Sequence, residues 1–410
     1  MNINEKTRAF IRQHADEDVR KVALLGAKDP EVDLQTALQQ IAGRQTARRK
    51  LPSWATVEDI VYPPHLNMEQ CSSEQTARYK ARLVGKGDRF TDLTGGFGVD
   101  FYWMSQGFSH RCYVERDEAL CTIAETNFRQ LSHPCSVSCC DTAAYLATME
   151  RASVVYLDPA RRNKEGGRTY SIEDCTPNVL ELLPLLMTKA ELVVVKLSPM
   201  LDWRKAIEDI EKSTSQPQAH VHEVHIVSVD NECKELLLLL RPEPSEGLRL
   251  VCVNNDSIFE ITKKPSDNRP SSTGLQHGQG AFLYEPNASI MKAGCFAELE
   301  QRFAVCQIAS NSHLFLSDDE MAGFPGRSFQ ILAVSSMNKQ EIKEKINKKF
   351  SKSLNPSSPM ERANIAVRNF PLTAELLRKK LKLKDGGDMY IFATTLADGQ
   401  HRLFFCRKIG

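Results

Sequence analysis

Apolar residues recur at helical spacing in the first 70 residues, where no strand-like alternation is visible. Leu34, Ala37 and Ile41 belong to one such pattern, which predicts an amphipathic helix. The helix is expected to end in a basic cluster just before Pro52. This cluster consists of Arg44, Arg48, Arg49 and Lys50. The pattern therefore predicts a helical N-terminal domain over residues 1–70.

A second helix is predicted to begin at Ser72, because Gln75 follows three residues later as in a capping box. Beyond Asp88 the pattern changes. Short apolar runs alternate with longer helical stretches, which indicates an α/β fold with a parallel sheet. The predicted parallel strands are Arg89–Leu93, Cys112–Glu115, Ser136–Cys139, Val154–Leu157 and Leu192–Leu197.

Two further apolar runs, Val224–Val229 and Glu235–Leu240, are separated by only five residues. No crossover helix fits into five residues, so this pair is predicted to be antiparallel. A parallel sheet that ends in an antiparallel hairpin differs from a plain dinucleotide-binding fold. This interpretation concerns the fold only. A function must be argued from the residues of the site.

The remaining chain is predicted to form small α+β domains. In residues 241–329 the sequence predicts two strands, a polar loop at Pro265–Gly280, and a helix at Ser289–Phe303 that Gly294 interrupts. Strands are expected at Leu248–Val253 and Ile258–Ile261. In the last segment, strands are expected at Phe329–Ser335, Ala363–Val367, Met389–Leu396 and Arg402–Arg407. Helices are expected at Lys339–Phe350 and Thr373–Leu383.

The composition is that of a soluble protein with more than one domain. The chain has 410 residues, with 41% hydrophobic and 26% charged residues, which excludes collagen-like, disordered and membrane classes. Its longest apolar runs are far shorter than the roughly 20 residues that span a bilayer. Twelve cysteines without an export signal predict reduced thiols and a cytoplasmic location. No pair is spaced Cys-x-x-Cys, so no metal site is expected.

Charge is distributed unevenly along the chain. Residues 330–410 contain 16 Lys and Arg against 7 Asp and Glu, a net charge of +9, and the rest of the chain carries −8. A basic segment on an acidic body favours contact with nucleic acid. A solvated lysine-rich surface is the alternative.

The strongest chemical signal is a glycine-rich turn directly after the first predicted parallel strand. It comprises Asp92, Leu93, Thr94, Gly95, Gly96, Phe97 and Gly98. Glycines allow a sharp turn and close approach to a ligand. A dehydrogenase would need glycine at position 101, which is Phe101, so a pyrophosphate cofactor is disfavoured. A purely structural turn remains an alternative.

Further acids follow the next strands. Glu115 ends the second strand, where an acid accepts bonds from ribose hydroxyls in nucleotide-binding folds. Asp141 follows the third strand and could accept from an adenine amino group; taken by itself it fits a helix N-cap better. Together with Asp92 they indicate an adenosine site, because open α/β sheets bind ligands at the carboxyl ends of their strands.

The fourth strand ends in Asp158 and Pro159, followed by Ala160 and Arg161. Proline after a strand-end acid fixes the backbone, so that the carboxylate and nearby carbonyls can point into a cleft. An ordinary strand-to-loop turn is the alternative. A mobile loop is expected at 166–168. Lys196, at the end of the fifth strand, is expected to pair with an acid of the sheet.

With these motifs the chain resembles the class I S-adenosylmethionine-dependent methyltransferases, which have a Rossmann-like sheet and a terminal antiparallel hairpin. It looks most like the bacterial branch with a ferredoxin-like domain and a THUMP-like C-terminal domain. The resemblance implies a methyltransferase domain over 71–240, a ferredoxin-like domain over 241–329 and a basic THUMP-like domain over 330–410. The THUMP-like part rests on the stretches Arg368–Leu372 and Lys384–Asp388.

The resemblance implies S-adenosylmethionine as cofactor and RNA, such as tRNA or rRNA, as partner. It assigns cofactor binding to Asp92, Thr94, Gly95, Gly96, Gly98, Glu115 and Asp141, and catalysis to Asp158, Pro159 and Arg161. Ala160 and Arg161 replace the proline and aromatic residue common in amino-group methyltransferases. Covalent C5 chemistry is disfavoured, because no cysteine follows the fifth strand.

The sequence therefore predicts a methyltransferase that acts on an exocyclic or ring nitrogen of an RNA base. Two alternatives stay open. The substrate could be a protein or small molecule, or the chain could bind cofactor and RNA without turnover.

Overall fold

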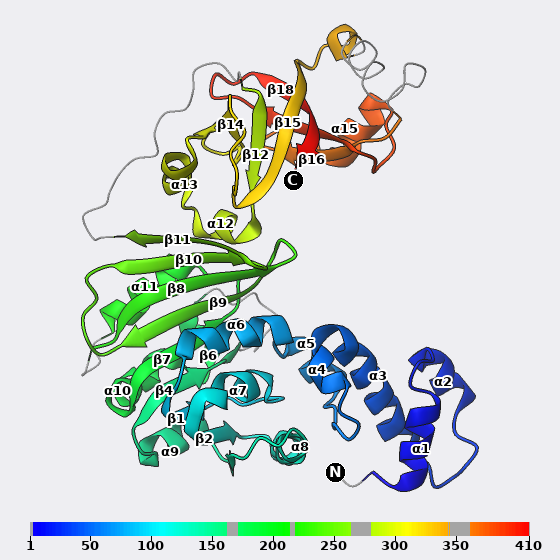
Figure 1. Ribbon diagram of the computed structural model, residues 1–410, viewed down its shortest axis with the longest axis vertical. Helices are drawn as coiled ribbons and strands as arrows, with labels where there is room; N and C mark the ends of the chain where they lie inside the picture. Colours follow the sequence, from blue (N-terminus) through cyan, green and yellow to red (C-terminus); the bar gives the residue numbers. More distant parts are fainter. Residues whose placement is uncertain are drawn as a thin grey trace. The chain divides into compact units, whose positions relative to one another are not determined.

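The computed structural model describes residues 3–161, 171–213, 218–263, 280–342, 344 and 361–409, and only the backbone of Arg161. The predicted loop at 166–168, nearly all of the polar loop at 265–280 and most of the helix at 339–350 lie outside these residues. The chain divides into two compact units (Figure 1). One comprises residues 1–224 and 235–248, and the other comprises residues 225–234 and 249–410.

The first unit begins with six helices, as the apolar pattern predicted. They are α1 (Glu5–Gln13), α2 (Val19–Leu25), α3 (Leu34–Lys50), α4 (Pro52–Ala55), α5 (His65–Gln70) and α6 (Glu74–Val84). The basic end of α3 directly precedes Pro52, as expected. Residues 1–70 belong to the same compact unit as the parallel strands that follow.

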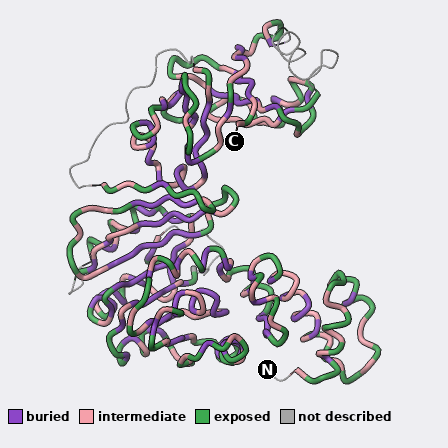
Figure 2. Tube along the Cα trace, viewed as in Figure 1, coloured by how far each residue is buried: buried purple, intermediate pink, exposed green. Residues whose placement is uncertain are grey.

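A nine-stranded sheet forms the centre of the fold, in the order β11-β10-β8-β9-β7-β4-β1-β2-β3. Its parallel strands are β1 (Gly87–Asp92), β2 (Phe108–Glu115), β3 (Ser136–Cys139), β4 (Ala152–Leu157) and β7 (Ala190–Leu197). All five predicted parallel strands are confirmed. The central strands β4 and β7 are nearly continuous apolar runs, as expected for parallel strands that are buried on both faces, and Figure 2 shows the buried residues following the strands.

The predicted antiparallel hairpin is also confirmed. It consists of β8 (His220–Val229) and β9 (Glu232–Arg241), and β9 pairs antiparallel with β7. Because β9 lies between β7 and β8, the sheet has the class I methyltransferase topology. Two strands that the sequence grouped with the following segment, β10 (Leu248–Asn254) and β11 (Ser257–Lys263), extend this sheet beyond β8.

Helices connect the parallel strands. They are α7 (Val99–Met104), α8 (Glu118–Gln130), α9 (Thr142–Thr148), α10 (Val179–Lys189) and α11 (Trp203–Lys212), together with the short 3₁₀ turns Ser105–Gly107 and Ile172–Asp174. A two-stranded ribbon of β5 (Ala160–Arg161) and β6 (Cys175–Thr176) follows β4. Among the described residues, no helix is long and apolar enough to cross a bilayer.

The second unit contains a seven-stranded sheet in the order β13-β14-β12-β15-β18-β17-β16. Its strands are β12 (Phe282–Pro286), β13 (Cys306–Gln307), β14 (Phe315–Ser317), β15 (Gly326–Ser335), β16 (Asn364–Arg368), β17 (Met389–Thr395) and β18 (His401–Ile409). Its helices include α12 (Ala288–Ala293), α13 (Phe296–Phe303) and α15 (Ala374–Leu381). The predicted interruption at Gly294 is confirmed: it ends α12 in a left-handed conformation.

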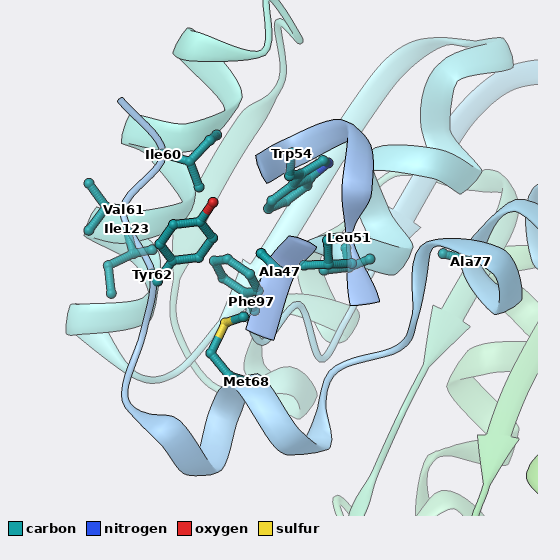
Figure 3. Close-up of a cluster of buried hydrophobic side chains, with 11 residues drawn as sticks. Ala47, Leu51, Trp54, Ile60, Val61, Tyr62, Met68, Ala77, Phe97 and Ile123 are labelled. Atoms are coloured by element: carbon teal, nitrogen blue, oxygen red, sulfur yellow. The ribbon is translucent and has the colours of Figure 1, made fainter. Parts of the chain in front are cut away.

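The N-terminal helices share a hydrophobic cluster with the glycine turn (Figure 3). Phe97, from the turn, lies with its ring centroid 5.2 Å from Trp54 and 6.3 Å from Tyr62. Asn127 of α8 is buried, and its side chain both accepts from the Val61 amide at 2.8 Å and donates to the Val61 carbonyl at 2.9 Å. The N-terminal segment is therefore part of the support of the turn.

Replacing Phe97 by alanine is expected to lower the free energy of unfolding by about 3–5 kcal/mol, because a buried aromatic ring is removed from this cluster. Urea denaturation followed by circular dichroism measures the change. Leu66→Ala is the control, since Leu66 is exposed and a surface change of this kind alters stability by about 0.5 kcal/mol or less. Equal stability of the two variants would contradict the prediction.

Candidate active site

The end of β1 is linked to the end of β4 through Thr94. The Thr94 amide donates to Asp92 Oδ1 at 2.9 Å, and the Asp158 amide donates to Thr94 Oγ1 at 2.6 Å. Asp92 is buried, and burial raises the pKa of its carboxyl well above the ordinary value. The structure thus brings together three of the residues that the sequence singled out.

The three glycines of the turn have different roles. A Cβ at Gly95 would lie 2.1 Å from Tyr113 Cε2, and one at Gly98 would lie 2.6 Å from Phe128 Cζ. These two glycines are required by packing against neighbouring rings. Gly96 has φ +56°, and a Cβ there would meet only the Thr94 carbonyl oxygen, at 3.9 Å. Its open side is where a ligand can approach the backbone.

Glu115 lies beside the glycine turn. Its Oε2 accepts from the Gly96 amide at 2.9 Å, and its Oε1 accepts from the amides of Arg116 and Asp117 at 2.8 and 2.9 Å. The Tyr113 hydroxyl donates to the Gly96 carbonyl at 2.5 Å. These bonds fix the carboxylate at the carboxyl end of β2, next to the open face of the turn.

Asp141 is the N-cap of α9, the alternative that the sequence left open. Its Oδ1 accepts from the amides of Ala143 and Ala144 at 2.9 and 3.2 Å. The preceding residue, Cys140, donates its amide to the Glu115 carbonyl at 3.0 Å. Asp141 therefore follows a residue that is directly bonded to the end of β2.

Asp158 forms an ion pair with Lys196, whose Nζ lies 2.5 Å from Asp158 Oδ2. The expectation that Lys196 pairs with an acid of the sheet is confirmed. Pro159 is buried behind Asp158, and the backbone of Arg161 continues into β5. Within the described residues, no cluster of His, Cys, Asp or Glu has a metal-binding arrangement.

Comparisons with known proteins bear on the fold and on the two C-terminal domains. Residues 282–325 match a family model described as a ferredoxin-like domain, and residues 326–408 match a THUMP domain-like model. The structure is similar to that of a "putative methyltransferase from Porphyromonas gingivalis W83", with a TM-score of 0.82, 29% identity and coverage of 100% of both chains. No match is found among curated proteins.

The chain has a class I methyltransferase fold with ferredoxin-like and THUMP-like domains.

Two smaller proteins have a remote likeness to part of this methyltransferase fold. One is M. capricolum TrmK in complex with S-adenosyl-homocysteine (8% identity, 42% of this chain, 69% of that chain, TM-score 0.32). The other is an rRNA methylase from Streptococcus thermophilus (11% identity, 40% of this chain, 93% of that chain, TM-score 0.30). These scores are too low to bear on the activity of this chain.

One prediction near the site of this methyltransferase fold is wrong. Ser73, not Ser72, caps α6, and its hydroxyl accepts from the Thr76 amide at 3.2 Å. The Ser72 hydroxyl instead donates to Asp100 Oδ2 at 2.7 Å. Either serine of Ser-Ser-Glu-Gln could cap the helix. Ser72 does not, because its hydroxyl is bonded to the buried Asp100 carboxylate.

Sequence reasoning also missed the charged residues beneath Asp158. Lys80, Asp100 and Glu235 are buried and come from α6, α7 and β9. A signal was available in the sequence. Lys80 lies at helical spacing between the apolar residues Ala77 and Val84, so it occupies a position on the face expected to be buried.

Proposed function

We propose that the protein transfers a methyl group from S-adenosylmethionine to an exocyclic or ring nitrogen of a base in RNA. The observation that carries this proposal is the arrangement at the carboxyl edge of the sheet. There Asp92, Glu115 and Asp158 are joined through the glycine turn, and Gly96 presents open backbone between them.

The residues at this edge fit the cofactor. A carboxylate offers about four acceptor sites, and three backbone amides occupy three of them on Glu115, so a ribose hydroxyl can bind to the remaining site. Both capping bonds of Asp141 end on Oδ1, so Oδ2 would accept from the adenine amino group. The amino-acid end would lie along the open backbone of Thr94 and Gly96. When bound, the cofactor supplies an electrophilic methyl group.

Asp158 would hold the nucleophile. Lys196 occupies Oδ2, so Oδ1 would accept an N–H from the base and orient its nitrogen lone pair toward the methyl carbon. The carboxylate would also stabilise the positive charge that develops on the nitrogen. The buried Pro159 limits backbone movement at this point, and Arg161 at the end of β5 would contact the substrate.

The basic THUMP-like segment would bind RNA. Glu285 is almost fully buried and holds two arginines: Arg368 Nη2 donates to Glu285 Oε1 at 2.7 Å, and Arg327 Nε donates to Oε2 at 2.8 Å. Three strands separate β12 from β16 in the sheet order, so the sheet must curl to bring them together. A guanidinium has five N–H donors, so both arginines retain donors for phosphate oxygens.

Replacing Arg368 by glutamine is expected to weaken RNA binding several-fold. It should also lower the slope of log Kd against log salt by about 0.7–0.9, the contribution of one phosphate contact. Filter binding to total cellular RNA across a salt series measures both. Arg249→Gln, which removes an equal charge from β10, is the control. A slope that both variants share with the wild type would contradict the prediction.

Part of the N-terminal basic cluster is used within the protein. Lys50 Nζ donates to the carbonyls of Met68 and Glu69 at 2.9 and 2.6 Å, and Arg48 pairs with Asp16. The RNA proposal therefore depends mainly on the C-terminal segment. All twelve cysteines are described and are free thiols, which supports a reducing compartment such as the cytosol.

The function is tested by incubating the protein with methyl-labelled cofactor and RNA from a strain that lacks the gene. Incorporation into RNA, followed by nucleoside mass spectrometry, would identify the base and atom. Incorporation into the protein or small-molecule fraction instead would favour the alternative substrates. Saturable S-adenosylhomocysteine binding without any incorporation would indicate a binding protein.

A further inference from the structure

A group of buried charged side chains lies directly beneath the Asp158–Lys196 pair. Its centre is Lys80 of α6, which is fully buried. Lys80 Nζ lies 2.6 Å from Glu235 Oε2, 3.1 Å from Asp100 Oδ1 and 3.1 Å from Ser72 Oγ. These partners come from β9, α7 and the segment before α6, so the group joins parts of the chain that are distant in sequence.

Ser72 and Asp100 connect Lys80 to Lys196. Ser72 Oγ is 3.3 Å from Lys196 Nζ and donates its own proton to Asp100 Oδ2 at 2.7 Å. Asp100 Oδ2 also accepts from the Tyr156 hydroxyl at 2.7 Å and lies 3.7 Å from Lys196 Nζ. The Ser72 hydroxyl therefore accepts from two lysines and donates to the carboxylate between them.

The charged forms are maintained inside this group. Burial disfavours ionised Asp100, but the positive charges of Lys80 and Lys196 outweigh it and lower its pKa to about 2. Burial alone would lower the pKa of Lys196, but the Asp158 and Asp100 carboxylates raise it above its ordinary value. Lys196 thus remains a cation that holds Asp158.

Stability alone gives a weak reason for such a group. Well-packed apolar residues of similar volume usually stabilise a core as well as buried ion pairs do, or better. Exposure also rises along the group, from 0% for the Lys80 side chain to 11% for Lys196 and 36% for Asp158. The group therefore reaches the surface at the residue proposed to hold the nucleophile.

We propose that Lys80 is a positioning residue of the methyl-transfer site, which through Ser72 and Asp100 holds Lys196 in place against Asp158. This inference rests on the proposed function. It makes α6 and the segment before it part of the catalytic arrangement, although none of their residues would touch the substrate. Loss of Lys80 would leave the cofactor site intact and disturb only the orientation of the Asp158 carboxylate.

The test compares kcat, the KM for RNA and S-adenosylhomocysteine affinity in four proteins. Lys80→Met is expected to lower kcat about 10–100-fold, the range seen when a residue that supports a metal ligand is lost, with KM and affinity within about threefold of the wild type. The Lys80→Met/Glu235→Gln variant removes the unpaired acid, so it should recover thermal stability while kcat stays low. Lys212→Met, which breaks an exposed ion pair on α11, should behave as the wild type.

Two results would overturn the inference: wild-type kcat in folded Lys80→Met, or recovery of both stability and kcat in the double variant. If Lys80→Met does not fold, Ser72→Ala carries the test, because it keeps both lysines and removes only the hydroxyl between them. A lowered kcat in that variant supports the inference, and an unchanged kcat overturns it. A wild-type protein that binds S-adenosylhomocysteine but methylates nothing would overturn the proposed function and this inference together.

Discussion

Replacing Asp158 by alanine is expected to lower kcat for methyl transfer by about 10³-fold while S-adenosylhomocysteine affinity stays within about threefold of the wild type. The change removes the acceptor that would hold the target N–H, and groups of this kind contribute about 10²–10⁴-fold. It also frees Lys196 from its 2.5 Å contact with Oδ2. The proposed cofactor contacts lie on β1, β2, the turn and the N-cap of α9, so they should be unaffected.

Single-turnover methyl transfer from labelled cofactor, with calorimetric titration of S-adenosylhomocysteine, separates these two effects. Asp88→Ala is a suitable control, because Asp88 is an exposed carboxylate on the same sheet. Retention of a tenth or more of the wild-type rate by Asp158→Ala would remove Asp158 from the catalytic assignment. A parallel loss of cofactor affinity would show that the substitution disrupts the whole edge.

Replacing Gly96 by valine is expected to weaken S-adenosylhomocysteine binding at least about 100-fold. At φ +56° a branched side chain is strained, and it would occupy the open side of the turn, where no atom now lies closer than 3.9 Å. The neighbouring acid Glu115, bonded to the Gly96 amide, would be displaced as well.

Gly26→Val separates strain from obstruction. Gly26 has φ +67°, also faces open space, and ends α2 in the N-terminal segment. Both glycines have positive φ, so both variants should lose thermal stability, and only Gly96→Val should lose calorimetric binding. Normal binding by Gly96→Val would refute a cofactor site at this turn.

Much of the fold could be predicted from local pattern. The central strands β4 and β7 are short, mainly apolar runs, and five residues between the next two apolar runs permit only an antiparallel hairpin. The pairing of β10 and β11 with this sheet could not be read in the same way. Their apolar residues predict two strands, but the strand with which they pair depends on long-range packing.

The site was predictable only where its residues follow strands directly. Asp92, Glu115 and Asp158 end neighbouring parallel strands, so topology alone brings them together. Gly95 and Gly98 are required because they pack against Tyr113 and Phe128, whereas Gly96 faces open space. The glycine motif alone does not reveal this difference. The assignments of all the predicted site residues to cofactor and substrate contacts stay predictions.

Lys80 and Glu235 are 155 residues apart in sequence, yet their side chains meet inside the protein. While the chain is being synthesised, the helix that carries Lys80 emerges long before the strand that carries its partner. A lysine with no access to water cannot keep its charge without a counter-charge. The proposed catalytic centre should therefore mature late during translation, only once β9 has left the ribosome.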